Sequence, residues 1–154
     1  MNDGAPPMIL ADAGASDRFG AVLAALVEPG DVITLAGLLG VGKTSIARGL
    51  LSALGLPGEA PSPSFAIVQP YAPPETRLPV LHIDLYRIDD PTEIDELGLD
   101  EGASESLLIV EWPERAPVDY WPHALALTLE FTEDGARRLT AQVPLPWKAR
   151  WSRI

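Results

Sequence analysis

Short runs of apolar residues alternate along the chain with polar, glycine-rich or proline-rich segments, a pattern typical of buried β-strands. The run LLIV at residues 107–110 has four consecutive aliphatic side chains, which predicts a strand covered on both faces. VITLAG at residues 32–37 predicts a second buried strand. Asp134-Gly135 suits the turn of a hairpin near the end of the chain. Further strands are expected in PMILA, FAIVQPY, LPVLHIDLYR, ALALTLEF and LTAQVPL.

Helical segments are expected between these strands. One covers about residues 16–26, with Ser16 as its N-terminal cap. A second is TSIARGLLSALG, which ends at Gly55. A short acidic helix over residues 91–97 is closed by Gly98. Strands that alternate with helices predict an α/β fold with a central mixed β-sheet flanked by helices.

Length and composition bound the class of protein. The 154 residues fit a single domain, 1–154, which can bury a sizeable core without a disulfide or a structural metal. The sequence has no cysteine, and its start, MNDGAPPMIL, has an acid where a secretory signal needs basic residues. The longest apolar run, AVLAALV, is far shorter than the ~20 residues of a membrane span. We therefore expect a soluble, cytoplasmic protein.

Charge is unevenly distributed. With 22 acids and 11 bases, the net charge of −11 disfavours autonomous nucleic-acid binding. Residues 89–105 carry eight carboxylates and no base, which we interpret as a solvated helix face. The tail, residues 137–154, carries five bases and no acid, interleaved with Trp147 and Trp151. This basic tail is expected either to contact nucleic-acid phosphate or an acidic partner, or to pack against the domain.

The segment GLLGVGKT, residues 37–44, matches G-x-x-x-x-G-K-[ST], follows a predicted strand and opens a predicted helix. Such a loop wraps its backbone N–H groups around phosphates, while Lys43 reaches the β and γ phosphates and the Thr44 hydroxyl ligates Mg²⁺. The alternative is a glycine-rich turn without a ligand. The residues expected to bind the nucleotide are Gly37, Gly40, Val41, Gly42, Lys43, Thr44 and Ser45.

A phosphate-binding loop of this kind needs an acid at the tip of another strand, to hold Mg²⁺ or to orient water. Asp84 in LHIDLYR and Glu111 after LLIV are the candidates. The alternative for Asp84 is a pair with Arg87 or a turn cap, and the alternative for Glu111 is a strand-end carboxylate in water. His82 shares a face with Asp84, because it lies two residues earlier, and is interpreted as a packed core histidine.

Five segments resemble the TsaE family in their order and spacing: GLLGVGKT, SPSF, HIDLYR, ELGLDE and EWPER. The resemblance covers about residues 31–115. It implies a P-loop NTPase fold and the ATPase subunit of bacterial tRNA threonylcarbamoyladenosine biosynthesis, with ATP and Mg²⁺ as cofactors. It also implies two protein partners, a carbamoyltransferase subunit and its paralogous scaffold subunit. The complex modifies the adenosine beside the tRNA anticodon, and this chain would meet tRNA indirectly or through its basic tail.

The resemblance also implies roles for particular residues. Lys43, Asp84 and Glu111 match the catalytic positions, and Asp84, Glu111 and Thr44 match the magnesium positions. Trp112 matches the tryptophan beside the nucleotide. Ser64 of SPSF stands where the family usually has threonine, and its hydroxyl would face the γ-phosphate.

The sequence departs from the family pattern at two places. Leu38 replaces the usual aspartate of the loop, so any polar contact of that acid is missing. Gly102-Ala103 replaces the usual aromatic residue after LGLDE, which puts the local packing there in doubt.

Three other functions share part of this pattern. A small P-loop kinase would need an acceptor site and an arginine-rich lid, and arginines are scattered before Arg137. A GTPase would need an Asn-Lys-x-Asp motif, whereas the single asparagine is Asn2. A non-catalytic nucleotide-binding adaptor would share the loop but lack steady-state hydrolysis.

Overall fold

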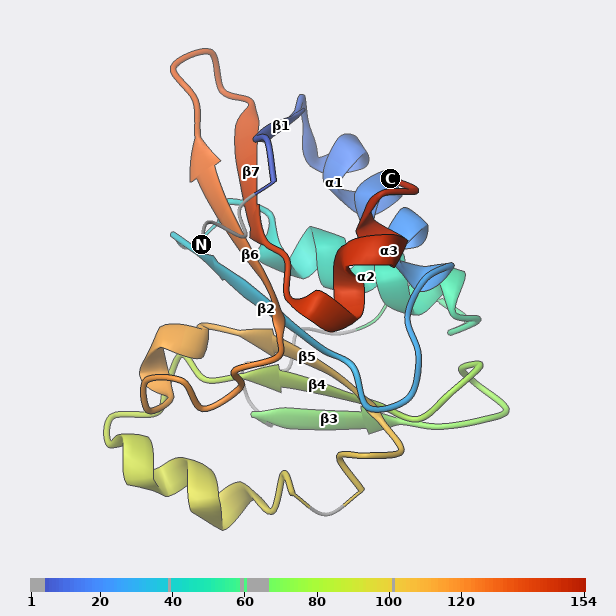
Figure 1. The fold of residues 1–154 in the computed structure, drawn as a ribbon, viewed down its shortest axis with the longest axis vertical. Coiled ribbons are helices and arrows are strands. Elements are labelled where there is room, and N and C mark those ends of the chain that lie inside the picture. Colours follow the sequence, from blue (N-terminus) through green and yellow to red (C-terminus); the bar gives the residue numbers. More distant parts are fainter. Residues whose placement is uncertain (1–4, 39, 59, 61–66, 101) are drawn as a thin grey trace.

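The computed structural model describes residues 5–38, 40–58, 60, 67–100 and 102–154. The described residues form one seven-stranded sheet in the order β1-β7-β6-β2-β5-β4-β3 (Figure 1). The strands are β1 (Met8–Leu10), β2 (Val32–Gly37), β3 (Val68–Tyr71), β4 (Val80–Asp84), β5 (Leu107–Glu111), β6 (Leu125–Phe131) and β7 (Arg137–Gln142).

The sheet is mixed, as predicted. β2 runs parallel to both β5 and β6, and β4 runs parallel to β5. The carboxyl ends of these four strands therefore meet at one edge of the sheet, where open α/β sheets place their ligands. β7 pairs antiparallel with β6 and β1, and β3 pairs antiparallel with β4. The expected turn of the last hairpin is confirmed, because the Gly135 N–H donates to the Thr132 carbonyl and Gly135 has a φ of 85°.

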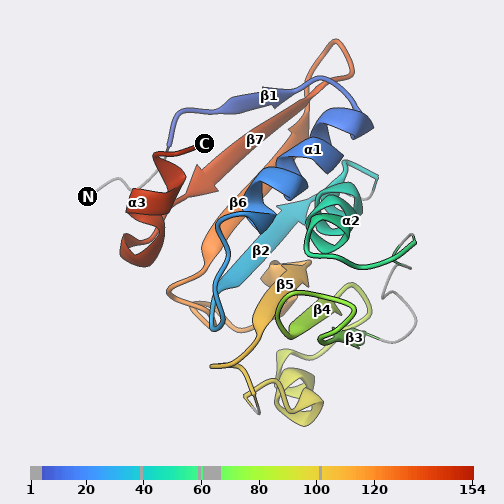
Figure 2. The ribbon, with the colours of Figure 1, turned by 90° about the vertical axis from the view of Figure 1, so that its right-hand side faces the viewer.

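Helices cover the sheet on both faces. The α-helices are α1 (Ala13–Ala24), α2 (Lys43–Ala53) and α3 (Lys148–Trp151), and the 3₁₀ helices are η1 (Pro91–Leu97), η2 (Pro113–Arg115) and η3 (Leu145–Trp147). Figure 2 shows α1 and α2 side by side on one face of the sheet. Their backbones touch at Gly20 and Gly49, where an added Cβ would lie 2.2 Å from the Ile46 carbonyl oxygen and 2.0 Å from that of Asp17. None of these helices, in the part of the chain that the structure describes, is long and apolar enough to cross a membrane.

The predicted start of the first helix was wrong. α1 begins at Ala13, with Asp12 as its cap: Asp12 is extended, and its Oδ1 accepts a hydrogen bond of 2.8 Å from the Ala15 N–H. Ser16 lies inside the helix and is fully buried. Asp and Ser cap helices about equally well, so the pattern of capping residues alone does not choose between them.

The predicted ends of the other two helices were right. After α2, the Gly55 N–H donates to the Ser52 carbonyl and the Leu56 N–H donates to that of Leu51, which is the Schellman arrangement of a glycine-terminated helix. The acidic helix forms as η1 and is closed by Gly98 in the left-handed conformation. Its buried anchor is Ile94, while most acids of residues 89–105 that the structure describes face solvent.

The core consists of two clusters, one on each face of the sheet. Leu107 and Ile109 pack in the cluster beneath α1 and α2, whereas Leu108 and Val110 pack in the cluster that includes Ile94 of η1. Because successive strand residues point to opposite faces, this alternation shows that β5 is covered on both sides, as the LLIV run predicted. Glu111 ends this strand and is itself 98% buried, with 2% of its surface exposed.

The basic tail, residues 137–154, forms β7, η3 and α3. Arg150 donates to both carboxylate oxygens of Asp31, at 2.6 and 3.1 Å. Its guanidinium carbon lies 4.0 Å from the centroid of the buried Trp147 ring. Trp151 contacts Phe19 of α1 edge-on. These residues follow the packing alternative of the sequence analysis, whereas Arg138 and Arg153 are exposed.

Candidate functional site

The glycine loop joins β2 to α2 at the edge where the parallel strands end. Gly37 has a φ of 145°, and a Cβ there would lie 2.6 Å from the Leu129 carbonyl oxygen, so the loop leaves the sheet through a position that excludes side chains. Gly42 is the N-cap of α2, is left-handed and has no side chain to cap the helix. The first N–H groups of α2 are thus available for an anion, and the helix dipole favours one there.

The remaining loop residues lie where the motif predicts. Val41 is fully buried and its N–H donates to the Leu38 carbonyl, which closes a turn inside the loop. Ser45 is half-buried in the first turn of α2. Leu38, the departure from the family's aspartate, is 71% exposed, so the loop does not depend on a buried contact at this position.

Lys43 is folded back over the loop. Its Nζ donates a hydrogen bond of 2.6 Å to the Gly37 carbonyl and lies 3.4 Å from the centroid of the Trp112 ring. Burial lowers the pKa of Lys43 below its ordinary value, and the nearby carboxylates of Glu111, Glu114 and Asp84 partly oppose that shift. In the free protein the ammonium group is thus held inside the glycine loop by one carbonyl oxygen and one aromatic ring.

Thr44 and Glu111 meet directly. The Thr44 hydroxyl donates to Glu111 Oε1 at 2.9 Å, which joins the first turn of α2 to the tip of β5. The second oxygen, Oε2, lies 2.7 Å from Nε2 of the fully buried His82. The alternative for Glu111, a carboxylate that simply reaches water, does not describe this side chain, because it is buried and each of its oxygens has a hydrogen-bond partner.

Asp84 lies beside Glu111 at the same edge. The two residues are register partners at the ends of the parallel strands β4 and β5. Asp84 is 6% exposed, and its Oδ1 accepts a hydrogen bond of 2.9 Å from the Tyr86 N–H. It therefore sits at a strand tip and also caps a turn, so both interpretations from the sequence describe part of its environment.

Trp112 follows Glu111 in a left-handed conformation with a φ of 61°, which is uncommon for a residue with a bulky side chain. Its ring packs between Lys43 and Tyr86, with 4.9 Å between the Trp112 and Tyr86 centroids. The side chain thus packs against Lys43 of the glycine loop, and its place beside the nucleotide stays a prediction. A groove beside the loop is lined by Gly37, Leu38, Trp112, Glu114 and Phe131, among others.

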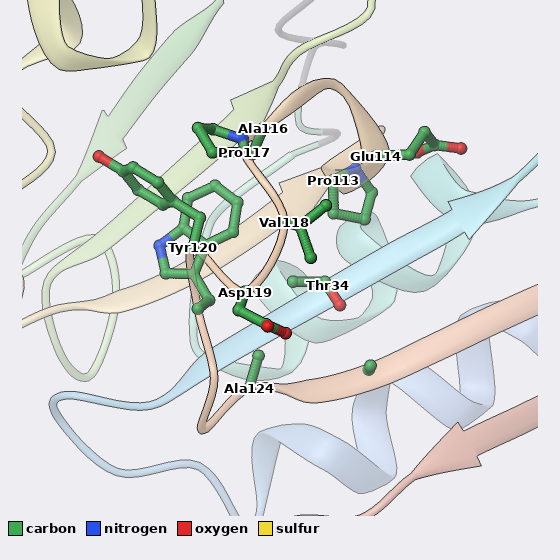
Figure 3. Close-up of a pocket in the computed structure, with 11 residues that line it drawn as sticks. Thr34, Pro113, Glu114, Ala116, Pro117, Val118, Asp119, Tyr120 and Ala124 are labelled. Carbon is green, nitrogen blue, oxygen red and sulfur yellow. The ribbon is translucent and has the colours of Figure 1, made fainter. Parts of the chain in front are cut away.

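A separate pocket lies on the sheet face away from α1 and α2 (Figure 3). Thr34 of β2 forms its floor, and the loop after η2 contributes Val118, Asp119 and Tyr120. Lys43 and Thr44 do not line this pocket. The predicted chemistry is therefore concentrated at the strand tips rather than in this pocket.

Two contacts were missed by the sequence analysis. His82 is in the core, as predicted, but it also holds the Glu111 carboxylate; the signal was its shared face with Asp84. Arg137 was assigned to the basic tail, yet its Nε donates to the Val41 carbonyl at 3.2 Å, inside the glycine loop. Ser64 and the SPSF segment lie outside the described residues, so their predicted role is not addressed by this structure.

The side chains present suit Mg²⁺ bound together with phosphate. The described residues contain no group of three or more His, Cys, Asp or Glu that could hold a metal ion. Magnesium is usually held by one or two carboxylates together with substrate phosphates, rather than by a cage of protein ligands. The Thr44 hydroxyl and the Glu111 carboxylate, with Asp84 adjacent, are oxygen donors of that kind.

The sequence profile of "Threonylcarbamoyl adenosine biosynthesis protein TsaE" matches residues 10–140. The chain belongs to the TsaE family. A relative from Synechocystis sp. PCC 6803, named tRNA threonylcarbamoyladenosine biosynthesis protein TsaE, is 39% identical over 122 residues, which are 76% of this chain and 76% of the relative. The TsaE protein of Bacillus subtilis strain 168 is 36% identical over 118 residues, covering 76% of this chain and 72% of the relative.

A solved structure has the same fold as this chain. The crystal structure of Bacillus subtilis YdiB matches it with a TM-score of 0.78 and 26% identity, covering 99% of this chain and 94% of YdiB. The family match spans the glycine loop, Asp84 and Glu111. The residues that carried the resemblance in the sequence thus fall inside the matched region.

Proposed function

We propose that this TsaE-family chain is a Mg²⁺-dependent ATPase that serves tRNA threonylcarbamoyladenosine biosynthesis. The observation that carries the proposal is the hydrogen bond from the Thr44 hydroxyl to Glu111, which places a carboxylate at the first turn of the glycine loop's helix. A glycine loop alone would bind phosphate. Hydrolysis also requires an acid that holds Mg²⁺ or orients water, and the buried Glu111 beside Thr44 would supply it.

Phosphate binding would use the loop backbone and Lys43. The N–H groups at the start of α2 and the left-handed glycines would surround the β and γ phosphates of ATP. Lys43 now contacts the Gly37 carbonyl and the Trp112 ring, and phosphate oxygens would replace these partners. Trp112 would then form one wall of the nucleotide site.

Hydrolysis would depend on the acids at the strand tips. Mg²⁺, held by Thr44 and Glu111 with Asp84 beside them, would neutralise negative charge on the phosphates when bound. The Glu111 carboxylate would orient the attacking water or hold the metal, and Lys43 would stabilise the charge on the transferred group. Ser64 would add a hydroxyl near the γ-phosphate.

The biological role follows from the names of the relatives, which are tRNA threonylcarbamoyladenosine biosynthesis proteins. ATP hydrolysis by this chain would support repeated turnover of a complex with a carbamoyltransferase subunit and its paralogous scaffold subunit. That complex would modify the adenosine beside the tRNA anticodon. The net charge of −11 suits a subunit that meets tRNA mainly through its partners.

The decisive experiment reconstitutes threonylcarbamoyl transfer to tRNA with the two partner subunits, with and without this chain. The proposal predicts more modified tRNA per complex when the chain and ATP are present. No gain in turnover would refute the biosynthetic role. Steady-state phosphate release in the same reaction separates an ATPase from an adaptor, because an adaptor would bind ATP without continuous release.

A further inference from the structure

His82 reaches the Glu111 carboxylate from the neighbouring strand. It is fully buried, and its Nε2 lies 2.7 Å from Glu111 Oε2. His82 of β4 is in register with Ile109 of β5, two residues before Glu111. Residues two apart on a strand share a face, so His82 lies on the face of the sheet from which the Glu111 side chain extends.

The two oxygens of Glu111 have different partners. Oε1 accepts from the Thr44 hydroxyl of α2, and Oε2 faces His82 of β4. A glutamate side chain has three rotatable bonds, and contacts on both oxygens restrict all of them. The Thr44 contact alone would fix the position of Oε1 but not the position of Oε2.

The partner of His82 Nε2 identifies the nitrogen that carries the hydrogen in this contact. Nδ1 is buried and has no hydrogen-bond partner among the described residues. An ionised carboxylate can only accept, so the contact requires an N–H at Nε2. The ring therefore donates to Glu111 from Nε2.

We propose that His82 is a positioning residue, which fixes Glu111 so that Oε1 stays on Thr44 and faces the phosphate site. This inference rests on the proposed function, because an oriented Glu111 is useful only if the chain binds and hydrolyses ATP. His82 acts through Glu111 and does not itself contact the nucleotide. Its role is thus distinct from that of a histidine that only fills the core.

Two variants separate positioning from packing. His82→Phe keeps a ring of similar volume but removes the donor, whereas His82→Gln keeps an N–H near the position of Nε2. In the reconstituted complex, His82→Phe should lower kcat for ATP hydrolysis by ~10- to 100-fold, the usual effect of losing such an orienting contact. His82→Gln should recover most of this loss. Equal losses in both variants, or a wild-type kcat in folded His82→Phe, would overturn the proposal.

A second readout does not use activity. Electron paramagnetic resonance of Mn²⁺ with a non-hydrolysable ATP analogue should show binding weakened about tenfold in His82→Phe and near normal in His82→Gln. Unchanged Mn²⁺ affinity in His82→Phe would count against the proposal.

The free wild-type protein provides a test that does not depend on a variant's folding. Nitrogen-15 NMR of the two histidines should show His82 with its hydrogen on Nε2, and a His123→Gln variant assigns the signals. A ring with no hydrogen on Nε2 would overturn the proposal. If the wild-type chain bound no ATP and hydrolysed none with its partners, the proposed function would fall. The NMR result would still decide the contact between His82 and Glu111.

Discussion

The Thr44 hydroxyl donates a hydrogen bond of 2.9 Å to Glu111 Oε1, across 67 positions of sequence. This bond joins the glycine loop to the tip of a different strand, and it exists because β2 and β5 are parallel neighbours. Their carboxyl ends therefore meet at the same edge. The proposed catalytic arrangement is thus a direct consequence of strand order.

Glu111→Gln should separate ATP binding from hydrolysis. The amide keeps the shape of the carboxylate but lacks the charge that would hold Mg²⁺ or polarise water. We expect ATP affinity measured by calorimetry to remain near wild type, while steady-state hydrolysis in the reconstituted complex falls by ~10²-fold or more. Near-wild-type hydrolysis by this variant would contradict the assignment of Glu111.

Lys43→Ala should abolish tight ATP binding. The substitution removes the ammonium group that would contact the β and γ phosphates. The matched control is Lys148→Ala, since Lys148 is the other lysine of the chain and lies in α3. Calorimetry should show binding lost in the first variant and retained in the second. Unchanged affinity in Lys43→Ala would refute a phosphate-binding role for this loop.

Lys43→Met should make the free protein more stable at pH 7. Burial lowers the Lys43 pKa below 10.5, so the folded chain holds fewer protons than the unfolded chain between the lowered pKa and 10.5. Wild-type stability therefore rises with pH across that interval, and below it the cost of burying the charge is fully present. The Tm of Lys43→Met should exceed that of wild type at pH 7, and the difference should shrink as the pH approaches 10.5. A lower Tm at pH 7 would contradict this account.

Arg137→Ala should weaken ATP binding without unfolding the chain. Arg137 donates to the Val41 carbonyl, so it braces the glycine loop from β7. A hydrogen bond from a charged group contributes ~1.5 kcal/mol. Without it, ATP must order the loop on binding, and the affinity for ATP should fall by about tenfold. The adjacent Arg138 is exposed, and Arg138→Ala is the control. Equal ATP affinities in the two variants would show that Arg137 does not support the loop.

The sequence predicted those features that depend on local pattern. The LLIV run predicted a strand covered on both faces, and Leu107 to Val110 alternate between the two core clusters. The position of the glycine loop between a strand and a helix was predicted correctly, because the conformation of the loop depends on its own residues. Its glycines adopt the positive φ angles that the loop requires. Glu111 was identifiable because a carboxylate interrupts an apolar strand.

Contacts between distant segments were harder to predict. The Asp134-Gly135 turn predicts that β7 pairs with β6, but nothing near Arg137 in sequence indicates that β6 lies beside β2, which brings Arg137 to the loop at Val41. His82 looked like an ordinary core residue because its partner is 29 positions away. Asp12 and Ser16 are both good caps, so the pattern of capping residues does not choose between them. Strand order supplies the contacts of Arg137 and His82.

Arg150→Ala should destabilise the fold while leaving the ATP site intact. Arg150 is 9% exposed, donates to both oxygens of Asp31 and to the carbonyls of Leu26 and Pro146, and hydrogen bonding to Asp31 raises its pKa. Removing it leaves the partly buried Asp31 carboxylate without this partner, which should cost roughly 2 kcal/mol, less than for a fully buried pair. Urea unfolding should show that loss, whereas the exposed Arg153→Ala should change stability by about 0.5 kcal/mol or less.

The same variant also tests whether the tail binds tRNA. If Arg150 acts by anchoring α3 to the domain, tRNA association of the reconstituted complex should show the same salt dependence in Arg150→Ala and wild type, because no phosphate contact is lost. A shallower salt dependence with unchanged unfolding would instead place Arg150 on nucleic acid. Truncation after Pro146 removes Trp147 and Arg150 together, and it should lower stability further than Arg150→Ala because the buried Trp147 ring is lost as well.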